Sequence, residues 1–415
     1  MRISRVVPAV LVALAAAVSL SAQKKTPPAF TQVLPMPSPA PEGAGEPGLI
    51  SDGRGHVILS WLEPAAGGVT RFRMSRFTGN TATEPVTIAQ GSNFFVNWAD
   101  VPSVFRAAND VLMAHWLERG GANRSAYDIK LAVSSDAGRT WIPSGTPHRD
   151  GKEAEHGFVS FFNHPRGGVG LIWLDGREMA SHGGDHMTAG PAATMLRTTQ
   201  VATGAQGPRA FGDDIAVDPK VCDCCSTSAA TTSEGVIVAY RDRSDKEVRD
   251  ISVSRFDGKT WSAPTRVHAD NWEINACPVN GPVVVANGAS VAVAWFTQAG
   301  GTAHSYVAFS KDAGRTFGAP VKIDSGTSFG RLSMVMPDAK RVLVGYIERA
   351  GDETSFLVRQ VSTTGTLAAP VKIASVSSER ASGFPRMAID GDRVVMAWTT
   401  VKSGRAAGVQ VAALR

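Results

Sequence analysis

One hydrophobic pattern recurs seven times along this chain. Each copy has a turn that contains glycine, then a run of mainly aliphatic residues that ends in an aromatic side chain, and in five copies an acid follows two positions later. Successive copies lie 51 to 67 residues apart. A strand-only unit that repeats about every 50 residues predicts a β-propeller in which each copy is one blade. The seven aromatic residues are Trp61, Trp116, Trp173, Tyr240, Trp295, Tyr346 and Trp398.

Each copy divides into four short strands, and the fifth copy shows this division best, with strands expected over 282–286, 290–296, 305–310 and 320–323. The seventh copy ends after its third strand, over 409–414, whereas residues 30–34 stand alone before the first copy. We expect residues 30–34 to complete the last blade and close the ring, which removes free strand edges. The predicted fold is an all-β propeller of four-stranded antiparallel blades, seven in number, or six if one copy is degenerate.

The chain before the first copy has two parts. Residues 1–22 combine a basic start (Arg2 and Arg5), an apolar run and a small-residue cleavage site, which is typical of a secretory signal peptide. An N-terminal membrane anchor is the alternative, although the apolar run is short. Residues 23–48 are rich in proline and predict an extended lead-in that includes the closing strand. With the propeller over 49–415, we expect a single-domain protein that is periplasmic or secreted.

Composition narrows the class of protein further. The 415 residues are 43% hydrophobic, which excludes wholesale disorder, and beyond residue 22 no apolar stretch reaches the roughly 18 residues needed to cross a bilayer. The formal net charge is +5, of which Arg2 and Arg5 supply two, and the other charges are interspersed rather than clustered. We therefore expect no membrane span after signal cleavage, no nucleic-acid partner and a monomer.

Two turns have closely matched sequences, SSDAGRTW over 134–141 and SKDAGRTF over 310–317, and SRFDGKTW over 254–261 is a weaker copy. In the first, Asp136 can accept backbone N–H groups and Gly138 allows a positive φ. These turns resemble the Asp-box, or BNR, repeat of the sialidase superfamily. The resemblance implies the propeller fold and, as an activity, an exo-glycosidase that acts on an anionic glycan; the Asp boxes themselves are structural in that family.

The resemblance also implies a set of catalytic residues. Sialidases use three arginines to bind the substrate carboxylate, a tyrosine nucleophile assisted by a glutamate, and an aspartate as acid and base. The candidate arginines here are Arg177, Arg241 and Arg386, the last within GFPRM, the closest match to the family's Phe/Tyr-Arg-Ile-Pro motif. Tyr127 is the tyrosine that we expect on the rim.

Topology places the candidate residues together. In a four-stranded antiparallel blade, the loops between strands 2 and 3 and the loops that lead into strand 1 lie on one face of the propeller, which we call the working face. These loops are unusually rich in polar residues over 148–160, 173–178, 213–228, 240–250 and 268–282. Loops held by rigid blades commonly carry function.

Carboxylates accompany the arginines on this face. Asp175 precedes Arg177, Asp242 follows Arg241, and Glu155 lies in the loop that leads into the third blade. The arginines could bind an anionic sugar bidentately while a carboxylate acts as general acid. Alternatively, the same residues form ion pairs between blades, repeated because the blades repeat.

All four cysteines also fall in loops that lead into strand 1 of neighbouring blades. Cys222, Cys224 and Cys225 lead into the fourth blade and Cys277 into the fifth. In an oxidising compartment they could form two disulfides. The alternative is a soft-metal site for copper or zinc, with thiolate ligands and His156.

Histidines offer a weaker metal candidate. The segment 181–187 places His182, Asp185 and His186 close in sequence, which suits a metal or is incidental in a glycine-rich loop. His115 lies inside a strand and is expected to be a buried core residue.

Two functional hypotheses result. The first is an exported sialidase-like hydrolase that needs no cofactor and acts on an anionic glycan, with Arg177, Arg241, Asp242, Arg386, Glu155 and Asp175 as candidate catalytic residues. The second is a non-catalytic periplasmic propeller that binds a ligand, a partner or a soft metal through its cysteine and histidine rim.

Overall fold

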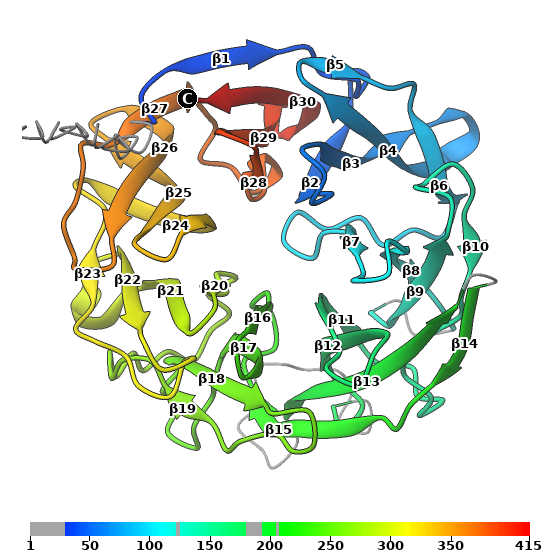
Figure 1. The fold of residues 1–415 in the computed structure, drawn as a ribbon, viewed down its shortest axis with the longest axis horizontal. Helices are drawn as coiled ribbons and strands as arrows, with labels where there is room; N and C mark the ends of the chain where they lie inside the picture. Colours follow the sequence, from blue (N-terminus) through cyan, green and yellow to red (C-terminus); the bar gives the residue numbers. More distant parts are fainter. Residues whose placement is uncertain (1–29, 122–124, 180–192, 205–206) are drawn as a thin grey trace, which may run out of the picture.

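Seven antiparallel sheets stand around a common axis in the computed structural model, which describes residues 30–121, 125–179, 193–204 and 207–415 (Figure 1). The all-β propeller with seven blades is confirmed, and the six-blade alternative is not. The signal-peptide prediction and the segment with His182, Asp185 and His186 lie outside the described residues. None of the helices in the described ranges has the length and apolar character needed to cross a membrane.

The first four blades follow one another along the chain, and in each the strands are given from the axis outward. Blade 1 consists of β2 (Gly45–Ser51), β3 (Val57–Pro64), β4 (Thr70–Thr78), β5 (Thr81–Ala82) and β6 (Val86–Gly91). Blade 2 consists of β7 (Ser103–Arg106), β8 (Leu112–Arg119), β9 (Tyr127–Ser134) and β10 (Ile142–Pro143). Blade 3 consists of β11 (His156–Asn163), β12 (Val169–Asp175), β13 (Thr194–Gly204), β14 (Gly207–Phe211) and β15 (Ile215–Val221). Blade 4 consists of β16 (Ser228–Thr232), β17 (Gly235–Arg241), β18 (Ile251–Phe256) and β19 (Thr265–Arg266).

The last three blades complete the ring. Blade 5 consists of β20 (Val283–Asn287), β21 (Ser290–Thr297), β22 (His304–Ser310) and β23 (Val321–Lys322). Blade 6 consists of β24 (Thr327–Asp338), β25 (Arg341–Ala350), β26 (Glu353–Ser362) and β27 (Val371–Ser375). Blade 7 consists of β28 (Arg386–Asp390), β29 (Arg393–Lys402), β30 (Arg405–Leu414) and β1 (Val33–Met36). In blades 1 and 3 two strands share the outer position, because β5 and β6 both pair with β4, and β14 and β15 both pair with β13.

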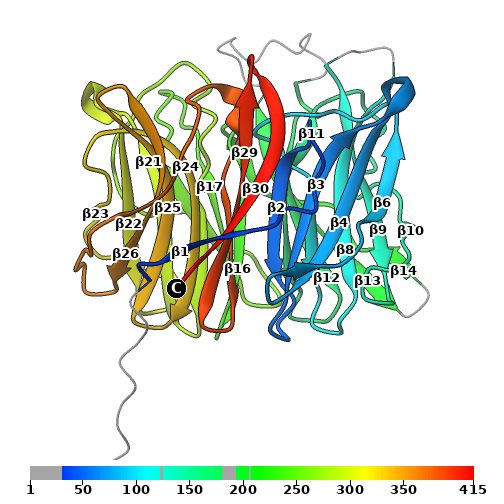
Figure 2. The ribbon, with the colours of Figure 1, turned by 90° about the horizontal axis from the view of Figure 1, so that it is seen from above.

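The N-terminal strand closes the ring, as predicted. β1 runs antiparallel to β30, with Val33 opposite Leu414 and Met36 opposite Val411, and it crosses the outside of blade 7 (Figure 2). The strand begins three residues later than the predicted segment 30–34. Because β1 covers the outer edge of β30, the two ends of the chain hold the last blade together.

The repeated aromatic residues pack between blades. Seven apolar clusters fill the seven spaces between neighbouring sheets, and all seven repeat aromatics are buried. In three blades the acid two residues later accepts a hydrogen bond from the indole nitrogen, which satisfies a buried donor within the same strand. These pairs are Trp61 with Glu63 (2.7 Å), Trp116 with Glu118 (2.7 Å) and Trp173 with Asp175 (2.8 Å).

The turns after β9 and β22 have the hydrogen bonds expected of them. Asp312 Oδ1 accepts the backbone N–H of Thr316 at 2.9 Å and the hydroxyl of Ser310 at 2.6 Å. Gly314 has φ +83°, and a Cβ at this position would collide with Ile237 of the neighbouring blade. These local contacts fix the outer turn of blade 5, and Asp136 makes the same contacts with Ser134 and Thr140 in blade 2.

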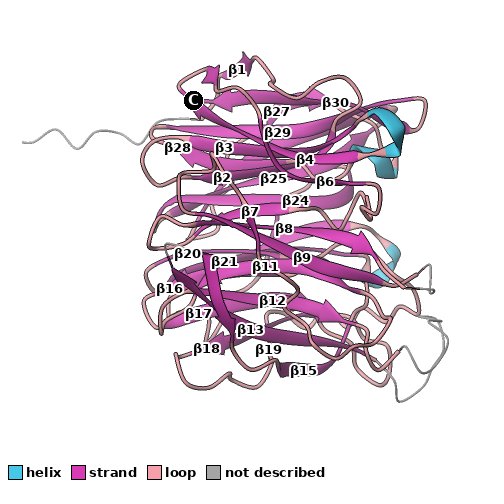
Figure 3. Cartoon of the chain, turned by 90° about the vertical axis from the view of Figure 1, so that its right-hand side faces the viewer, coloured by secondary structure: helices cyan, strands magenta, loops and turns pink. Residues whose placement is uncertain are grey.

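The working face carries the helices of the described residues. Three 3₁₀ helices, η1 (Ala66–Gly68), η3 (Ala299–Gly301) and η4 (Arg380–Ser382), lie on the same side of the propeller (Figure 3). η1 and η3 connect strands 2 and 3 of their blades, whereas η4 belongs to the loop that leads into β28. The two kinds of loop therefore share one face, as predicted.

Candidate functional site

The innermost strands of all seven blades surround one cavity of about 290 Å³. In blades 2, 4, 5 and 7 the lining begins before or at the start of the inner strand, which places the cavity toward the working face. Its polar lining consists mostly of hydroxyl groups, together with one carboxyl and one guanidinium group. These residues are Ser103, Ser160, Ser226, Thr227, Ser228, Ser333, Asp100 and Arg386. A concave site with a few converging polar groups is the usual form of a ligand site.

Arg386, one of the three candidate arginines, lies at the start of β28 in this cavity. Burial lowers the pKa of Arg386 to about 10, so the guanidinium is still charged at neutral pH. Within the part of the chain that the structure describes, Arg386 forms no ion pair. Its positive charge is therefore available to an anion that enters the cavity.

Asp100 faces the same cavity from the loop that leads into blade 2. Asn97 Oδ1 accepts the backbone N–H of Asp100 at 3.3 Å and so shapes the turn that holds this residue. Asp100 Oδ1 accepts the backbone N–H of Phe158 at 2.9 Å, whereas its buried Oδ2 has no hydrogen-bond partner among the described residues. Phe158 has φ +54°, a left-handed conformation that is unusual for a bulky residue and that turns its N–H toward Asp100.

The environment of Asp100 favours the protonated acid. Burial raises its pKa to about 7, the N–H of Phe158 acts in the opposite direction, and the charge of Glu155 raises it further. Glu155, a predicted catalytic residue, bridges to Tyr127 through the backbone. Tyr127 is itself buried, rather than on the open rim as expected. Asp100, Glu155 and Tyr127 are therefore close enough to interact electrostatically, and of the three Asp100 lines the cavity.

His115 lies behind the cavity wall and confirms the prediction of a buried core histidine. It is fully buried, and its Nδ1 lies 2.9 Å from the hydroxyl of Ser103, which lines the cavity. Burial lowers the pKa of His115 to about 3, and the charge of Arg386 contributes in the same direction. The imidazole is therefore neutral at physiological pH and supports Ser103.

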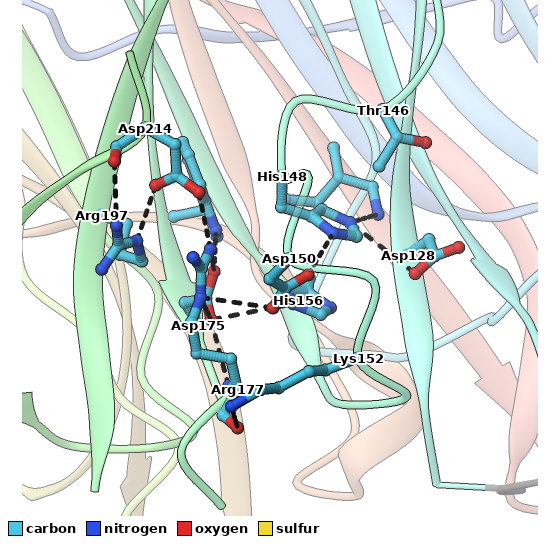
Figure 4. A network of polar contacts seen from close by, with 12 residues as sticks. Asp128, Thr146, His148, Asp150, Lys152, His156, Asp175, Arg177, Arg197 and Asp214 are labelled. Carbon is cyan, nitrogen blue, oxygen red and sulfur yellow. Dashed lines mark hydrogen bonds and ion pairs between the residues drawn. The ribbon is translucent and has the colours of Figure 1, made fainter. Parts of the chain in front are cut away.

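A second polar cluster joins blades 2 and 3 (Figure 4). The rings of His148 and His156 stack with centroids 3.7 Å apart and planes within 2° of parallel. His156 Nε2 lies 3.1 Å from Asp150 Oδ2 and 3.7 Å from Asp175 Oδ1, while His148 Nε2 lies 3.7 Å from Asp128 Oδ1. His156 is completely buried.

Arg177 is the cation of this cluster. Its Nε and Nη2 donate to the two oxygens of Asp175 at 2.7 and 2.6 Å, and Nη2 also donates to Asp214 at 2.7 Å. Asp214 in turn accepts from Arg197 Nε at 2.6 Å (Figure 4). Two predicted catalytic residues, Arg177 and Asp175, are therefore bidentate partners of each other inside blade 3.

Neighbouring charges and hydrogen bonds shift the pKa values of Asp175 and His156 in this cluster. Burial raises the pKa of Asp175, but hydrogen bonds and charge from Arg177 and the charge of His156 outweigh it and hold the pKa below its usual range. Burial likewise lowers the pKa of His156, but Asp150 and Asp175 outweigh it and raise the pKa above its usual value. Asp128, His148 and His156, and also Asp150, His156 and Asp175, have ligand atoms within 4.8 Å of one another. Asp150 and Asp175 pair with Arg177 and His156, whereas His156 Nδ1 and Asp150 Oδ1 are buried without a hydrogen-bond partner among the described residues.

Three cysteines form a third cluster at the start of blade 4. One sulfur from each of Cys222, Cys224 and Cys225 lies within 4.8 Å of the others, and the Sγ atoms of Cys222 and Cys225 are 3.4 Å apart. All four cysteines of the chain are free thiols in this structure. A hydrogen bond from Cys224 lowers the pKa of the Cys277 thiol, so the fourth cysteine adjoins the cluster. His156 belongs instead to the network of Asp150 and Asp175.

No protein-family model matches the chain, and no curated protein sequence matches it. Among solved structures, an ulvan lyase, a polysaccharide lyase, is similar with a TM-score of 0.54 at 13% identity over 91% of this chain and 97% of its own. The same kind of enzyme bound to a GlcA(1-4)Rha3S unit has a TM-score of 0.53, also at 13% identity over 91% and 97% of the two chains. The endosialidase of phage phi92 has a TM-score of 0.50 at 10% identity over 93% of this chain and 69% of its own.

The chain has a sialidase-like propeller fold. In this sialidase-like propeller the three candidate arginines have different surroundings, because Arg386 lines the cavity, Arg177 is paired with carboxylates, and Arg241 lies inside the protein.

Arg241 is 1% exposed and donates to three backbone carbonyls. Nη1 donates to Arg249 O at 2.6 Å, while Nη2 donates to Asn280 O at 2.8 Å and to Phe296 O at 2.7 Å. Its guanidinium also lies 5.0 Å from the ring centre of Trp272. These contacts join blades 4 and 5 and give each guanidinium nitrogen a backbone partner.

Asp242, the next predicted residue, is also held internally. It accepts the backbone N–H of Arg243 at 2.7 Å and the hydroxyl of Ser252 at 2.9 Å. Burial and then the charge of Asp218 raise its pKa above the usual value. Asp242 is thus half-buried and hydrogen-bonded within blade 4.

The sequence singled out Arg386, which lines the cavity, and Glu155, which does not, but it did not single out Asp100. The signal was present in the segment 97–102, where one acid stands between the apolar residues that lead into blade 2. Its partner Phe158 is 58 residues away, so only the folded ring brings the two together.

Proposed function

We propose that this protein binds the end of an anionic glycan in its central cavity and cleaves it, with Asp100 as the general acid. The observation that carries the proposal is that an ion-pair-free cation, Arg386, and a carboxyl with a pKa near neutrality, Asp100, line the same hydroxyl-rich cavity.

Arg386 provides recognition. A guanidinium without a carboxylate partner can bind the carboxylate or sulfate of an acidic sugar through two parallel hydrogen bonds. The surrounding serine and threonine hydroxyls suit the hydroxyl groups of the same sugar. A cavity of about 290 Å³ enclosed by seven strands is better suited to a chain end than to a chain that crosses the surface.

Asp100 provides the proton. A carboxyl group that remains protonated near pH 7 can donate to the glycosidic oxygen as the bond breaks. Glu155, which acts electrostatically on Asp100, is the neighbouring carboxylate, and glycosidases commonly use such pairs of acids. The named proteins of similar fold, an ulvan lyase and an endosialidase, support a glycan as the class of substrate.

Export belongs to the same proposal. Residues 1–22 have the features of a signal peptide, and extracellular or periplasmic glycans are then the accessible substrates. The test is the N-terminus of the protein recovered from the periplasm or the medium. A chain that begins near Gln23 supports export, and one that retains Met1 in the cytoplasm contradicts it.

The activity test compares the wild type with Asp100→Asn and Arg386→Gln on oligosaccharides that end in sialic acid or a uronate. We expect Asp100→Asn to lose turnover but keep binding, and Arg386→Gln to lose binding of acidic sugars. Arg106→Gln and Asp110→Asn, which change an ion pair between the end of β7 and the turn that follows it on the opposite face, are charge-matched controls. Release of reducing ends without an unsaturated product indicates hydrolysis, whereas an unsaturated uronate indicates a lyase. If both active-site variants match the wild type on every acidic glycan that is cleaved, the proposal fails.

A further inference from the structure

The thiol cluster of blade 4, defined by Cys222, Cys224 and Cys225, lies outside the central cavity and takes no part in the function proposed above. We propose that these three thiolates form a binding site for Cu(I).

The spacing of the three sulfurs fits a metal ion. The three sulfurs lie within 4.8 Å of one another, and a metal with bonds of about 2.3 Å to three thiolates holds them roughly 4 Å apart. The 3.4 Å between the Sγ atoms of Cys222 and Cys225 increases to that spacing with a shift of a few tenths of an ångström on each side. The site therefore needs little rearrangement to accept an ion.

The loop that carries the thiols is fixed by its surroundings. The backbone N–H of Cys222 donates to Arg241 O at 3.0 Å, and Val221 bridges to Asp242 at the end of β17. Arg241 is anchored by carbonyls of the next blade, as described above. The ligands thus stand on a rigid part of the propeller, as a preorganised metal site requires.

A buried guanidinium group lies against the cluster. Arg249 Nη1 lies 3.4 Å from Cys222 Sγ, within hydrogen-bond distance, and Arg249 is itself 1% exposed. Arg249 and Arg243 are held by Glu247, with contacts of 2.8 Å each. A buried guanidinium that donates to one ligand sulfur orients it and offsets the negative charge of a metal–thiolate centre.

The cluster is also accessible. Cys222 and Cys225 are buried, Cys224 is half-buried, and the adjoining Cys277 is exposed. An ion can therefore arrive at Cys277 and Cys224 and pass to the buried pair. Such an access path is one of the requirements of a workable site.

The number of ligands distinguishes copper from zinc. Thiolate donors select soft ions such as Cu(I) and Zn(II). Structural zinc is almost always four-coordinate, and here three sulfurs lie within mutual reach, with no histidine among them in the described residues. Three thiolates therefore favour Cu(I), whereas Zn(II) would need Cys277 as a fourth ligand.

The experiment uses the full chain purified under reducing conditions and titrated with Cu(I) against a competing chelator. We expect one Cu(I) per chain, protection of the thiols from alkylation by the bound ion, and loss of both effects in Cys222→Ser and Cys225→Ser. Cys277→Ser keeps Cu(I) binding, which separates a three-thiolate site from a four-thiolate zinc site. Arg249→Gln weakens binding by roughly 10-fold, as the loss of an outer partner of a ligand does, while Arg266→Gln, an exposed charge-matched control, does not.

Alkylation of the wild-type thiols with and without Cu(I) tests the proposal even if a serine variant fails to fold. A disulfide between Cys222 and Cys225 in the chain isolated without reductant, unaltered by Cu(I), would overturn the proposal. Equal protection of all thiols by Zn(II) and Cu(I), abolished by Cys277→Ser, would overturn the choice of copper.

Discussion

Asp100 Oδ1 accepts a hydrogen bond from the backbone N–H of Phe158 at 2.9 Å, across the boundary between blades 2 and 3. The partner oxygen, Oδ2, is buried beside Gly157, where a Cβ would collide with it. A carboxyl group held in this way has one stabilising donor and little water, which is why its protonated form is favoured near pH 7.

The first prediction concerns the pH dependence of stability. Because the folded pKa of Asp100 is about 7 and its usual value is 3.8, the folded protein binds one more proton than the unfolded chain between these limits. The contribution of Asp100 to the free energy of unfolding therefore falls as the pH rises from about 4 to 7. Asp100→Asn should remove this loss. The stability difference between the variant and the wild type should therefore shift in favour of the variant by about 3 kcal/mol from pH 5 to pH 8. Urea unfolding at the two pH values measures it, and an unchanged difference would contradict the assignment.

His115 gives a prediction of opposite slope. Its folded pKa of about 3 lies below the usual 6.5, so below pH 6.5 the unfolded chain takes up a proton that the folded protein does not. Stability supplied by the neutral imidazole is thus lost as the pH falls from 6.5 toward 3. His115→Gln should flatten the acid limb of the stability curve. His268→Gln, at a histidine whose side chain is 41% exposed, is the control. Identical acid limbs for the wild type and His115→Gln would show that the imidazole titrates normally.

Arg241 should prove to be a structural residue. Arg241→Ala leaves three backbone carbonyls without their donor and should lower the free energy of unfolding by about 2–4 kcal/mol. Arg241→Lys should be destabilising too, because one ammonium group cannot reach all three carbonyls. Neither change should alter the affinity of the folded protein for an acidic sugar. If a stable Arg241→Lys variant selectively lost affinity for the acidic sugar, Arg241 would be a binding residue and this prediction would be wrong.

The turn after β22 offers a local test. Asp312→Ala removes the acceptor of the Ser310 hydroxyl and of the Thr316 N–H, which should cost about 1–2 kcal/mol. Asp352→Ala, in an exposed turn of blade 6, should change stability by less than about 0.5 kcal/mol. Chemical denaturation of both variants against the wild type compares them directly. Equal effects would mean that the hydrogen bonds of this turn add nothing.

Ring closure can be tested by shortening the chain. A protein that begins at Ser38 lacks β1 and exposes the edge of β30, so it should unfold at a lower temperature and aggregate. A protein that begins at Phe30 keeps β1 and serves as the control. Thermal unfolding followed by light scattering distinguishes them, and equal curves would show that β1 contributes little to closure.

The sequence predicted the propeller fold better than it predicted the surroundings of the candidate site residues, for a physical reason. Blade number, the closing strand and the turn at Asp312 depend on hydrophobic periodicity and short-range turn chemistry, which repeat along the chain. The placing of Arg386 followed from topology, since every loop that leads into strand 1 reaches the axis. The structural role of Arg241 depends instead on hydrogen bonds to the carbonyls of Asn280 and Phe296, and no local sequence pattern predicts these contacts. Asp100 was not predicted as a site residue for the same reason, because Phe158 becomes its hydrogen-bond partner only in the closed ring.

The most direct test of the central claim is the affinity of the wild type and of Arg386→Gln for sialic acid and glucuronate, measured by calorimetry with a neutral hexose alongside. The cavity described here predicts that the wild type binds at least one acidic sugar and prefers it to the neutral one. It also predicts that Arg386→Gln loses this preference by at least about 10-fold, since one charge-assisted hydrogen bond is worth roughly 1.5–3 kcal/mol. Equal affinities of the two proteins for every acidic sugar would contradict the claim that Arg386 receives the anionic group.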